Sequence, residues 1–354
     1  MAKSASAANI VSSVSARRWE EPLLHGGDLA AGRRLFPDAP EPFIDLSTGI
    51  NPNPYPLSRL PADVFARLPD ADKLASLTAI AAQTYGAPSG AHVVVAPGTQ
   101  ILLPLVAALV RPGRAAILAP SYGEFSRAAA LVGHSVAEVD GLAAIGDAQL
   151  VSVANPNNPD GRLLARNDLM ALAKNLRVHG GLLVVDEAFM DVGPCSASLA
   201  GDVSSSNVVV LRSFGKFFGL AGVRLGFALA APTIAARLSA MLGPWAVSGP
   251  ALAIGAKGLA DTAWIKKTRT RLATSAEKLD GFLTDSGLDV VGGTNLFRLV
   301  RTDTASELFD HLGRAGILVR RFPGQANWLR FGLPANARAW RRLQIALAGF
   351  KQSR

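Results

Sequence analysis

The chain has 354 residues, of which 49% are hydrophobic and 18% are charged. This composition excludes a wholly disordered chain, and the length is enough for a large core and more than one domain. The formal net charge is +9, but the basic residues are dispersed and form no stripe interleaved with aromatic residues, so we expect no nucleic-acid partner. The single cysteine, Cys195, excludes a disulfide within the chain and a thiolate zinc cluster, and the five scattered histidines give no indication of a metal.

The first 18 residues are rich in Ala and Ser and contain no acidic residue. A transit peptide has such a composition, but an extended apolar core and a clear cleavage site are missing. We therefore expect a flexible tail over residues 1–20 and a cytoplasmic protein. The apolar run at 102–110 is too short to span a bilayer and contains a proline, so no membrane partner is expected either.

Short apolar runs alternate with helix-compatible segments from residue 91 onward. The runs lie at 92–96, 115–119, 149–154, 181–188, 207–213 and 226–230, and helices are expected at 99–110, 124–132 and 166–179. Runs that are apolar on both faces are typical of strands covered by helices on both sides. The pattern predicts an α/β fold, with a mainly parallel sheet flanked by helices in a large domain over residues 46–250. The proline-dense segment 41–60 before it cannot form a regular helix.

The pattern changes after about residue 250. Residues 251–283 indicate one long helical region. Strand-like segments follow at 288–300, 317–322 and 328–333, and helix-like segments at 304–315 and 335–350. This order predicts a smaller α+β domain over residues 251–354, to which residues 21–45 contribute an N-terminal segment.

Lys216 lies in the most informative stretch, residues 211–227, which follows a strand of the buried type. Open α/β sheets bind ligands at the carboxyl ends of their strands. Apolar and glycine neighbours desolvate an amine and so suit it to Schiff-base chemistry. Ser213 and Arg224 on either side offer a hydroxyl and a guanidinium, the groups that bind a phosphate. The alternative interpretation is a surface lysine in a glycine-rich loop.

Polar residues also follow other predicted strands. Asp186 ends the run 181–188, where a buried carboxylate needs a partner; a protonated pyridine nitrogen, a metal or a helix N-terminus would serve. The loop 155–161 carries Asn158, an amide donor for a cofactor ring, although turn chemistry alone also explains its composition.

Two further segments precede predicted helices. Gly98 and Thr99 open a helix whose free backbone amides attract phosphate. Tyr122 follows the run 115–119 and suits stacking on an aromatic cofactor, or simple packing. Because each of these segments follows a different strand of one sheet, we expect them to converge at one edge.

These residues resemble those of the fold-type I enzymes that use pyridoxal 5′-phosphate (PLP), the aspartate aminotransferase superfamily. The resemblance covers about residues 41–335 and is most specific in NPNNPDG, DEAF and RSFGKFFGLAGVRLGF. It implies that Lys216 holds PLP as a Schiff base and that Asp186 pairs with its pyridine nitrogen, both as catalytic residues. The other residues implied in cofactor binding are Gly98, Thr99, Tyr122, Asn158, Ser213 and Arg224.

Within the superfamily the chain is similar to the histidinol-phosphate aminotransferase branch, and most similar to the threonine-phosphate decarboxylases of cobalamin biosynthesis. The features behind this are the segments 25–28 and 45–52, and Phe189, where aminotransferases usually carry a tyrosine. The resemblance implies substrate-binding roles for His25, Asn51, Arg320 and Arg330, the last toward a carboxylate.

Three positions depart from the pattern of the relatives. Gly215 stands where many have a serine, Asp160 where threonine is usual, and Leu68 where relatives lend a tyrosine to the cofactor phosphate of the other subunit. We expect looser anchoring of the cofactor phosphate as a result.

The resemblance leaves more than one activity open. The first is decarboxylation of L-threonine O-3-phosphate to (R)-1-aminopropan-2-yl phosphate, and the second is transamination of a phosphorylated amino compound such as histidinol phosphate. A PLP-binding regulator without turnover is the third, but residues 1–40 are too short for a DNA-binding domain. The resemblance also implies a homodimer, because the family builds its site at a subunit interface.

Overall fold

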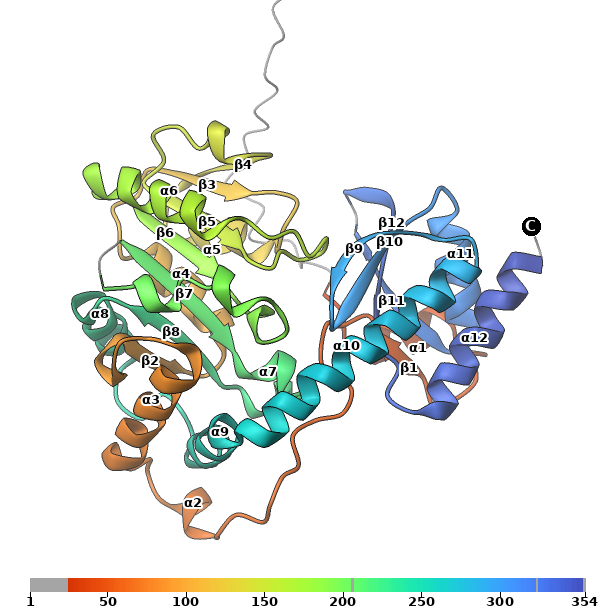
Figure 1. Cartoon of the computed structure of the whole chain (residues 1–354), viewed down its shortest axis with the longest axis horizontal. Coiled ribbons are helices and arrows are strands. Elements are labelled where there is room, and N and C mark those ends of the chain that lie inside the picture. Colours follow the sequence, from red (N-terminus) through yellow and green to blue (C-terminus); the bar gives the residue numbers. More distant parts are fainter. Residues whose placement is uncertain (1–24, 205–206, 323, 353–354) are drawn as a thin grey trace, which may run out of the picture.

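The computed structural model describes residues 25–204, 207–322 and 324–352, and the predicted tail over residues 1–20 lies outside them. A seven-stranded sheet and a five-stranded sheet organise the chain. Helix α10 (Thr262–Asp285) runs from beneath the first sheet to the second (Figure 1). In the part of the chain that the structure covers, no helix combines the length and the hydropathy needed to cross a membrane.

The seven-stranded sheet confirms the predicted α/β fold. In sheet order its strands are β2 (Val93–Ala96), β8 (Gly226–Ala230), β7 (Val208–Ser213), β6 (Leu182–Asp186), β5 (Leu150–Ala154), β3 (Arg114–Leu118) and β4 (Ser135–Val139). Neighbouring strands run parallel, except that β8 is antiparallel to β2 and β7. The apolar runs became strands because both faces of the sheet are covered: Val208 and Val210 pack into one apolar cluster, and Val209 and Leu211 into another.

Helices cover both faces of this sheet (Figure 1). They are α3 (Ala71–Tyr85), α4 (Thr99–Ala107), α5 (Glu124–Leu131), α6 (Arg166–Val178), α8 (Pro232–Leu242) and α9 (Gly249–Ala260), with the short α2 (Asp63–Ala66) and α7 (Phe214–Phe217). The segment 41–60 contains no helix, as its prolines predict.

The five-stranded sheet brings the N-terminal segment together with the C-terminal part of the chain. Its strands, in sheet order, are β1 (Ile44–Leu46), β11 (Ile317–Phe322), β12 (Gln325–Gly332), β10 (Phe297–Arg301) and β9 (Asp289–Thr294). The helices α1 (Leu29–Leu35), α11 (Ala305–Arg314) and α12 (Ala337–Gln352) pack with it. β1 is parallel to β11, and the other pairs are antiparallel. The boundaries predicted for the two domains, at residues 46 and 250, stay predictions.

The prediction of one helix over 251–283 is wrong, because Asp261 separates α9 from α10. The Asp261 backbone leaves the helical region at φ −82° and ψ 74°, and its Oδ1 accepts a hydrogen bond from Trp264 N at 2.9 Å. The Tyr55 hydroxyl donates to Asp261 Oδ2 at 3.2 Å. A new helix therefore begins at this aspartate, which acts as its N-cap.

The two sheets approach each other backbone to backbone at three glycines. Gly293 N donates to Asp160 O at 2.8 Å. A Cβ on Gly161 would lie 1.9 Å from Gly293 O, and one on Gly292 would lie 2.1 Å from Asp160 O. Only glycine fits at 161 and 292, and this contact fixes the loop after β5 against β9.

Candidate active site

The segments singled out in the sequence lie at one edge of the seven-stranded sheet. β3, β5, β6 and β7 are mutually parallel, so their carboxyl ends share this edge. β2 ends here as well, because it is separated from β7 by the antiparallel β8, which begins at the same edge: Gly226 faces both Ala96 and Ser213. The topology thus places the turns after five strands side by side.

Lys216 lies on α7, directly after β7. Phe214, Phe217 and Phe218 on this turn are at most 1% exposed and point into the core, which leaves Lys216 half-buried on the open side. Burial, with Arg330 and Arg224 adding to it and Asp186 opposing it, lowers the pKa of Lys216 to about 8. An amine with such a pKa is partly unprotonated near neutral pH.

Asp186 is the last residue of β6 and is half-buried. Its Oδ1 accepts a hydrogen bond from Ala188 N at 3.0 Å. Burial raises the pKa of Asp186 to about 6, although this hydrogen bond and Lys216 oppose the shift. The carboxylate is therefore incompletely solvated and suited to a cationic partner.

Arg224 and the start of α4 form a cradle for an anion. Gly98, the N-cap of α4, has φ +87°, and a Cβ there would lie 2.7 Å from Arg224 Nη2. Gly226 leaves room for the Thr99 amide in the same way, since its Cβ would lie 2.6 Å from Thr99 N. Free amides of a helix start and a guanidinium thus face each other, with Ser213 at the adjacent end of β7.

Arg330 connects the two sheets. It is 6% exposed, its Nη1 donates to Asn158 Oδ1, and its Nη2 donates to Ser47 O at 2.8 Å. Because the Asn158 oxygen is occupied, its amide NH2 remains a donor toward the site. Burial lowers the pKa of Arg330 to about 9; Arg320 adds to this shift, whereas Asp45 opposes it.

Arg320 lies opposite Arg330 in the antiparallel pair of β11 and β12, so both side chains project from the same face. Burial lowers the pKa of Arg320, and the nearby Tyr122 opposes the shift. The next residue, Arg321, lies over the Phe309 ring at 4.0 Å, on the opposite face, as strand alternation predicts.

Tyr122 and His25 belong to a chain of hydrogen bonds whose middle members the sequence analysis missed. The Tyr122 hydroxyl donates to Gln100 Oε1 at 3.0 Å, Gln100 Nε2 donates to Glu124 Oε2 at 2.6 Å, and His25 Nε2 lies 3.1 Å from Glu124 Oε1. Burial, with Glu124 and Asp186 adding, raises the pKa of Tyr122 to about 12. A glutamate in the first turn of a helix normally indicates only a favourable dipole contact, so the sequence carried no signal for this role.

Asn51 supports the Lys216 turn. It is 2% exposed; its Nδ2 donates to Phe217 O and its backbone N to Lys216 O, both at 2.9 Å. The predicted contact of Asn51 with substrate stays a prediction.

The unusual residues near the site have local explanations. Phe189, in place of the usual tyrosine, packs edge-on against Phe297 and has its ring centre 5.9 Å from Lys216 Nζ. A Cβ on Gly215 would lie 3.0 Å from Ala221 Cα, which leaves little room for the serine of relatives. Asp160 Oδ1 accepts from Asn157 Nδ2 at 2.7 Å and closes its own turn.

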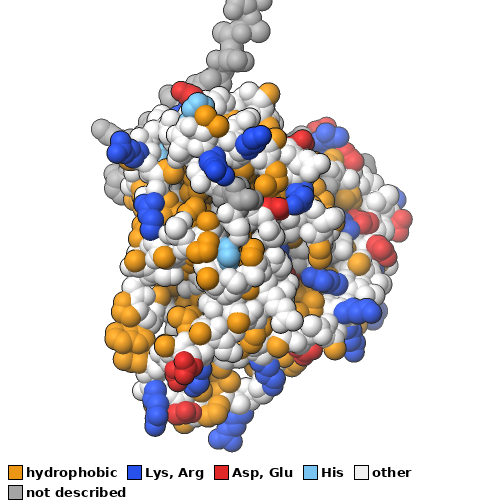
Figure 2. Space-filling view, turned by 60° about the vertical axis from the view of Figure 1, so that its left-hand side comes forward, with side chains coloured by type: hydrophobic (Ala, Val, Ile, Leu, Met, Phe, Trp, Pro, Cys, Tyr) orange, Lys and Arg blue, Asp and Glu red, His pale blue; other side chains and the backbone are white. Residues whose placement is uncertain are grey.

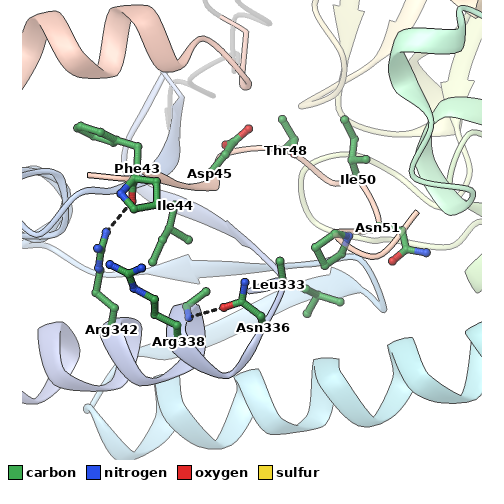
Figure 3. A pocket seen from close by; sticks show the side chains of 14 residues that line it. Phe43, Ile44, Asp45, Thr48, Ile50, Asn51, Leu333, Asn336, Arg338 and Arg342 are labelled. Carbon is green, nitrogen blue, oxygen red and sulfur yellow. Dashed lines mark hydrogen bonds between the residues drawn. The ribbon is translucent and has the colours of Figure 1, made fainter. Parts of the chain in front are cut away.

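A cavity of about 400 Å³ lies next to this site, between β1 and the start of α12 (Figure 3). It shares Asn51 with the candidate site, whereas Lys216 and Asp186 do not line it. Figure 3 shows Arg342 donating to the Pro42 carbonyl, a hydrogen bond of 2.8 Å.

Comparisons with known proteins agree with this geometry. The profile of the family "aminotransferase class I and II" matches residues 57–339. A threonine-phosphate decarboxylase of Sinorhizobium is 43% identical, over 92% of this chain and 98% of its own length. A histidinol-phosphate aminotransferase of Ralstonia nicotianae is 31% identical, over 92% and 95%. The crystal structure of histidinol-phosphate aminotransferase from Sinorhizobium meliloti in complex with pyridoxal-5′-phosphate shares the fold, with a TM-score of 0.80 and 24% identity over 95% of this chain and 97% of that one.

The chain therefore belongs to the aminotransferase class I and II family.

Proposed function

We propose that the protein is a PLP-dependent enzyme that decarboxylates L-threonine O-3-phosphate to (R)-1-aminopropan-2-yl phosphate, as part of cobalamin biosynthesis. The observation that carries this proposal is the pairing of Arg320 with Arg330 on one face of β11 and β12, which provides one cation for a carboxylate and one for a phosphate. The 43% identity to a threonine-phosphate decarboxylase supports the same activity.

The residues of the site fit PLP. Asp186 is a desolvated carboxylate with a pKa raised to about 6 by burial, which a protonated pyridine nitrogen would offset. The Gly98 turn and the Arg224 guanidinium leave space for an anion and exclude a side chain. Lys216, whose pKa burial lowers to about 8, would hold the aldehyde. Asn158 and Tyr122 would contact the ring.

When bound, PLP supplies an aldehyde carbon that condenses with an amine and a ring that accepts the electron pair of the Cα–carboxylate bond. Lys216 Nζ would hold that carbon while no substrate is bound, and the same amine would be in place to give a proton to the substrate Cα. Asp186 would pair with the protonated ring nitrogen and favour its charged form. The Asn158 NH2 would be available to the ring oxygen, since Arg330 donates to its Oδ1.

The substrate would lie between the two sheets. Arg330 binds its carboxylate, and Arg320 and His25 bind its phosphate. The replacement of the usual tyrosine by Phe189, 5.9 Å from Lys216 Nζ, keeps this part of the site free of a hydroxyl.

Transamination of histidinol phosphate is the second candidate, because a named aminotransferase is 31% identical over most of the chain. The purified holoenzyme, incubated with threonine phosphate, separates the two. We expect one carbon dioxide for each aminopropyl phosphate formed, and no glutamate when 2-oxoglutarate is added. Glutamate formation without carbon dioxide would overturn the decarboxylase proposal.

We also infer a homodimer. Leu57, Phe65, Leu68 and Trp245 are large apolar side chains that are 58–67% exposed. The segment of Trp245 adjoins that of Phe65, since a Cβ on Gly249 would lie 2.4 Å from Val64 O. On the face seen in Figure 2 hydrophobic side chains gather along one edge, among dispersed Lys and Arg. A second copy of the chain would cover such a surface; light scattering on the purified protein tests this.

The cytoplasmic location stays a prediction.

A further inference from the structure

Glu124 is a buried carboxylate to which the proposed function gives no role. It is 4% exposed at the start of α5. A buried carboxylate is costly without partners, and Glu124 has several. Gln100 Nε2 lies 2.6 Å from Oε2, His25 Nε2 lies 3.1 Å from Oε1, and Arg127 Nη1 lies 3.5 Å from Oε1.

One arm of this arrangement reaches Tyr122 through Gln100. Because Gln100 Nε2 donates to Glu124, its Oε1 faces the Tyr122 hydroxyl, which donates to it at 3.0 Å. The orientation of the amide, and with it the position of the tyrosine ring, is thus set by the carboxylate.

The other arm holds His25, on the segment that precedes α1. The His25 side chain is 46% exposed, so packing alone does not fix it. Farther along, Gly27 N donates to Ser47 Oγ at 2.7 Å, and Ser47 O accepts from Arg330. Glu124 therefore ties a segment attached to the five-stranded sheet to a helix of the seven-stranded sheet.

We propose that Glu124 is a positioning residue that sets the preference for a phosphorylated substrate. It holds His25 by Nε2, so that Nδ1 is presented to the substrate phosphate. The centroids of the His25 and Tyr122 rings are 5.9 Å apart, so His25 lies beside the residue that the proposed function places on the cofactor ring. This inference rests on the proposed function, because it takes His25 as a phosphate ligand.

Substrate discrimination tests the proposal. In Glu124→Gln holoenzyme we expect kcat/KM for threonine phosphate to fall about tenfold through KM, while kcat/KM for unphosphorylated L-threonine stays within about twofold. Glu124→Asp, which keeps the charge but shortens the reach to His25, should lose the same preference. Glu138→Gln is the matched control, because Glu138 is an exposed carboxylate on β4 that bonds to Ser126, outside this chain of contacts.

A double-mutant cycle shows whether Glu124 acts through His25. The variant that combines His25→Ala with Glu124→Gln should prefer phosphorylated over unphosphorylated substrate no less than His25→Ala alone. Two results would overturn the inference: losses of kcat/KM that multiply in the double variant, or equal losses on phosphorylated and unphosphorylated substrates. A carboxylate with only a structural role would give such results.

Binding of inorganic phosphate to the holoenzyme, measured by calorimetry, gives a readout independent of turnover. We expect His25→Ala and Glu124→Gln to weaken it by the same factor, about tenfold, and Glu138→Gln to leave it unchanged. Wild-type affinity in Glu124→Gln would overturn the inference. A wild-type holoenzyme that binds phosphate but releases no carbon dioxide from threonine phosphate would instead overturn the proposed function.

Discussion

Asp186 and Glu187 are adjacent carboxylates at the end of β6 with opposite surroundings. Glu187 is 0% exposed and accepts hydrogen bonds from Arg212 at 2.9 Å, Ser198 at 2.6 Å and Leu199 N at 2.7 Å. Asp186, in the described part of the chain, accepts the single bond from Ala188 N. The carboxylate of Glu187 is thus fully paired within the protein, whereas that of Asp186 can still accept a cationic partner.

The neighbouring strand β7 and the turn after it show the same contrast between a paired and an incompletely paired group. Arg212, on β7, bonds to Asp191 at 2.7 Å and lies 4.3 Å from the centre of the Tyr85 ring, whereas Lys216 beyond it faces the open site. Burial opposes the charge of Arg212, but Asp191 and Glu187 outweigh it and raise its pKa; for Lys216 burial prevails and lowers the pKa. The paired network stabilises the ends of both strands, and the incompletely paired groups in front of it are free for chemistry.

Lys216→Ala should have the largest effect, because it removes the reactive amine. We expect kcat/KM to fall by at least about 10⁴-fold with little change in folding. Borohydride reduction of the wild-type holoenzyme followed by mass spectrometry should place a pyridoxyl group on Lys216. Lys257→Ala, which removes an exposed lysine bonded to Ser58, should keep both activity and label. A label elsewhere contradicts the assignment.

Arg212→Leu tests the paired side of the comparison. It leaves Glu187 and Asp191 buried without their cation, so we expect the free energy of unfolding to fall by about 3–5 kcal/mol in urea titrations. Arg166→Leu is the control, because its pair with Asp202 lies nearer the surface and should contribute about 1 kcal/mol or less. Equal losses of unfolding free energy in the two variants would show that the buried ion pairs of Arg212 stabilise the protein no more than a pair nearer the surface.

Asp186→Asn should stabilise the protein once the cofactor has been removed. The pKa of Asp186 is about 6 when folded and 3.8 when unfolded, so the folded carboxylate is penalised above pH 6 and not below pH 4. The variant should gain about 1–3 kcal/mol at pH 7.5, and the gain should vanish as the pH falls through this window. Denaturant titrations at several pH values check this; a gain independent of pH argues against desolvation as its cause.

Ser198→Ala should have the smallest effect. Glu187 keeps Arg212 and Leu199 N as partners, so the loss of one hydroxyl should cost about 1 kcal/mol in thermal or urea unfolding. Ser196→Ala, at an exposed position, is expected to change stability by less than about 0.5 kcal/mol.

The sequence predicted the elements whose pattern is local. The buried strands were found within one or two residues, because each is an uninterrupted apolar run. β4 was missed, since SVAEV at the sheet edge mixes exposed and buried positions and gives no such run. The break at Asp261 was missed as well, because helix-compatible residues continue on both sides of it, although an aspartate that caps a helix is a local signal.

The candidate site was predicted where one residue type at a strand end suffices, as for Lys216 and Asp186. The pairing of Arg330 with Asn158 joins residues far apart in the sequence, and so does that of Glu124 with His25. Such contacts depend on how the two sheets are placed, and no local pattern encodes this placement.

The backbones of Gly161 and Gly293 are in such close contact that the two sheets would pivot at this point. When one body rotates on another, points near the pivot are displaced least. If the five-stranded sheet rotated about this contact, Asn158, three residues before Gly161, would be displaced little against Arg330, and the distant α12 would move farther. A methyl group at Gly161 would push the two sheets apart at this contact and move Arg330 away from Asn158.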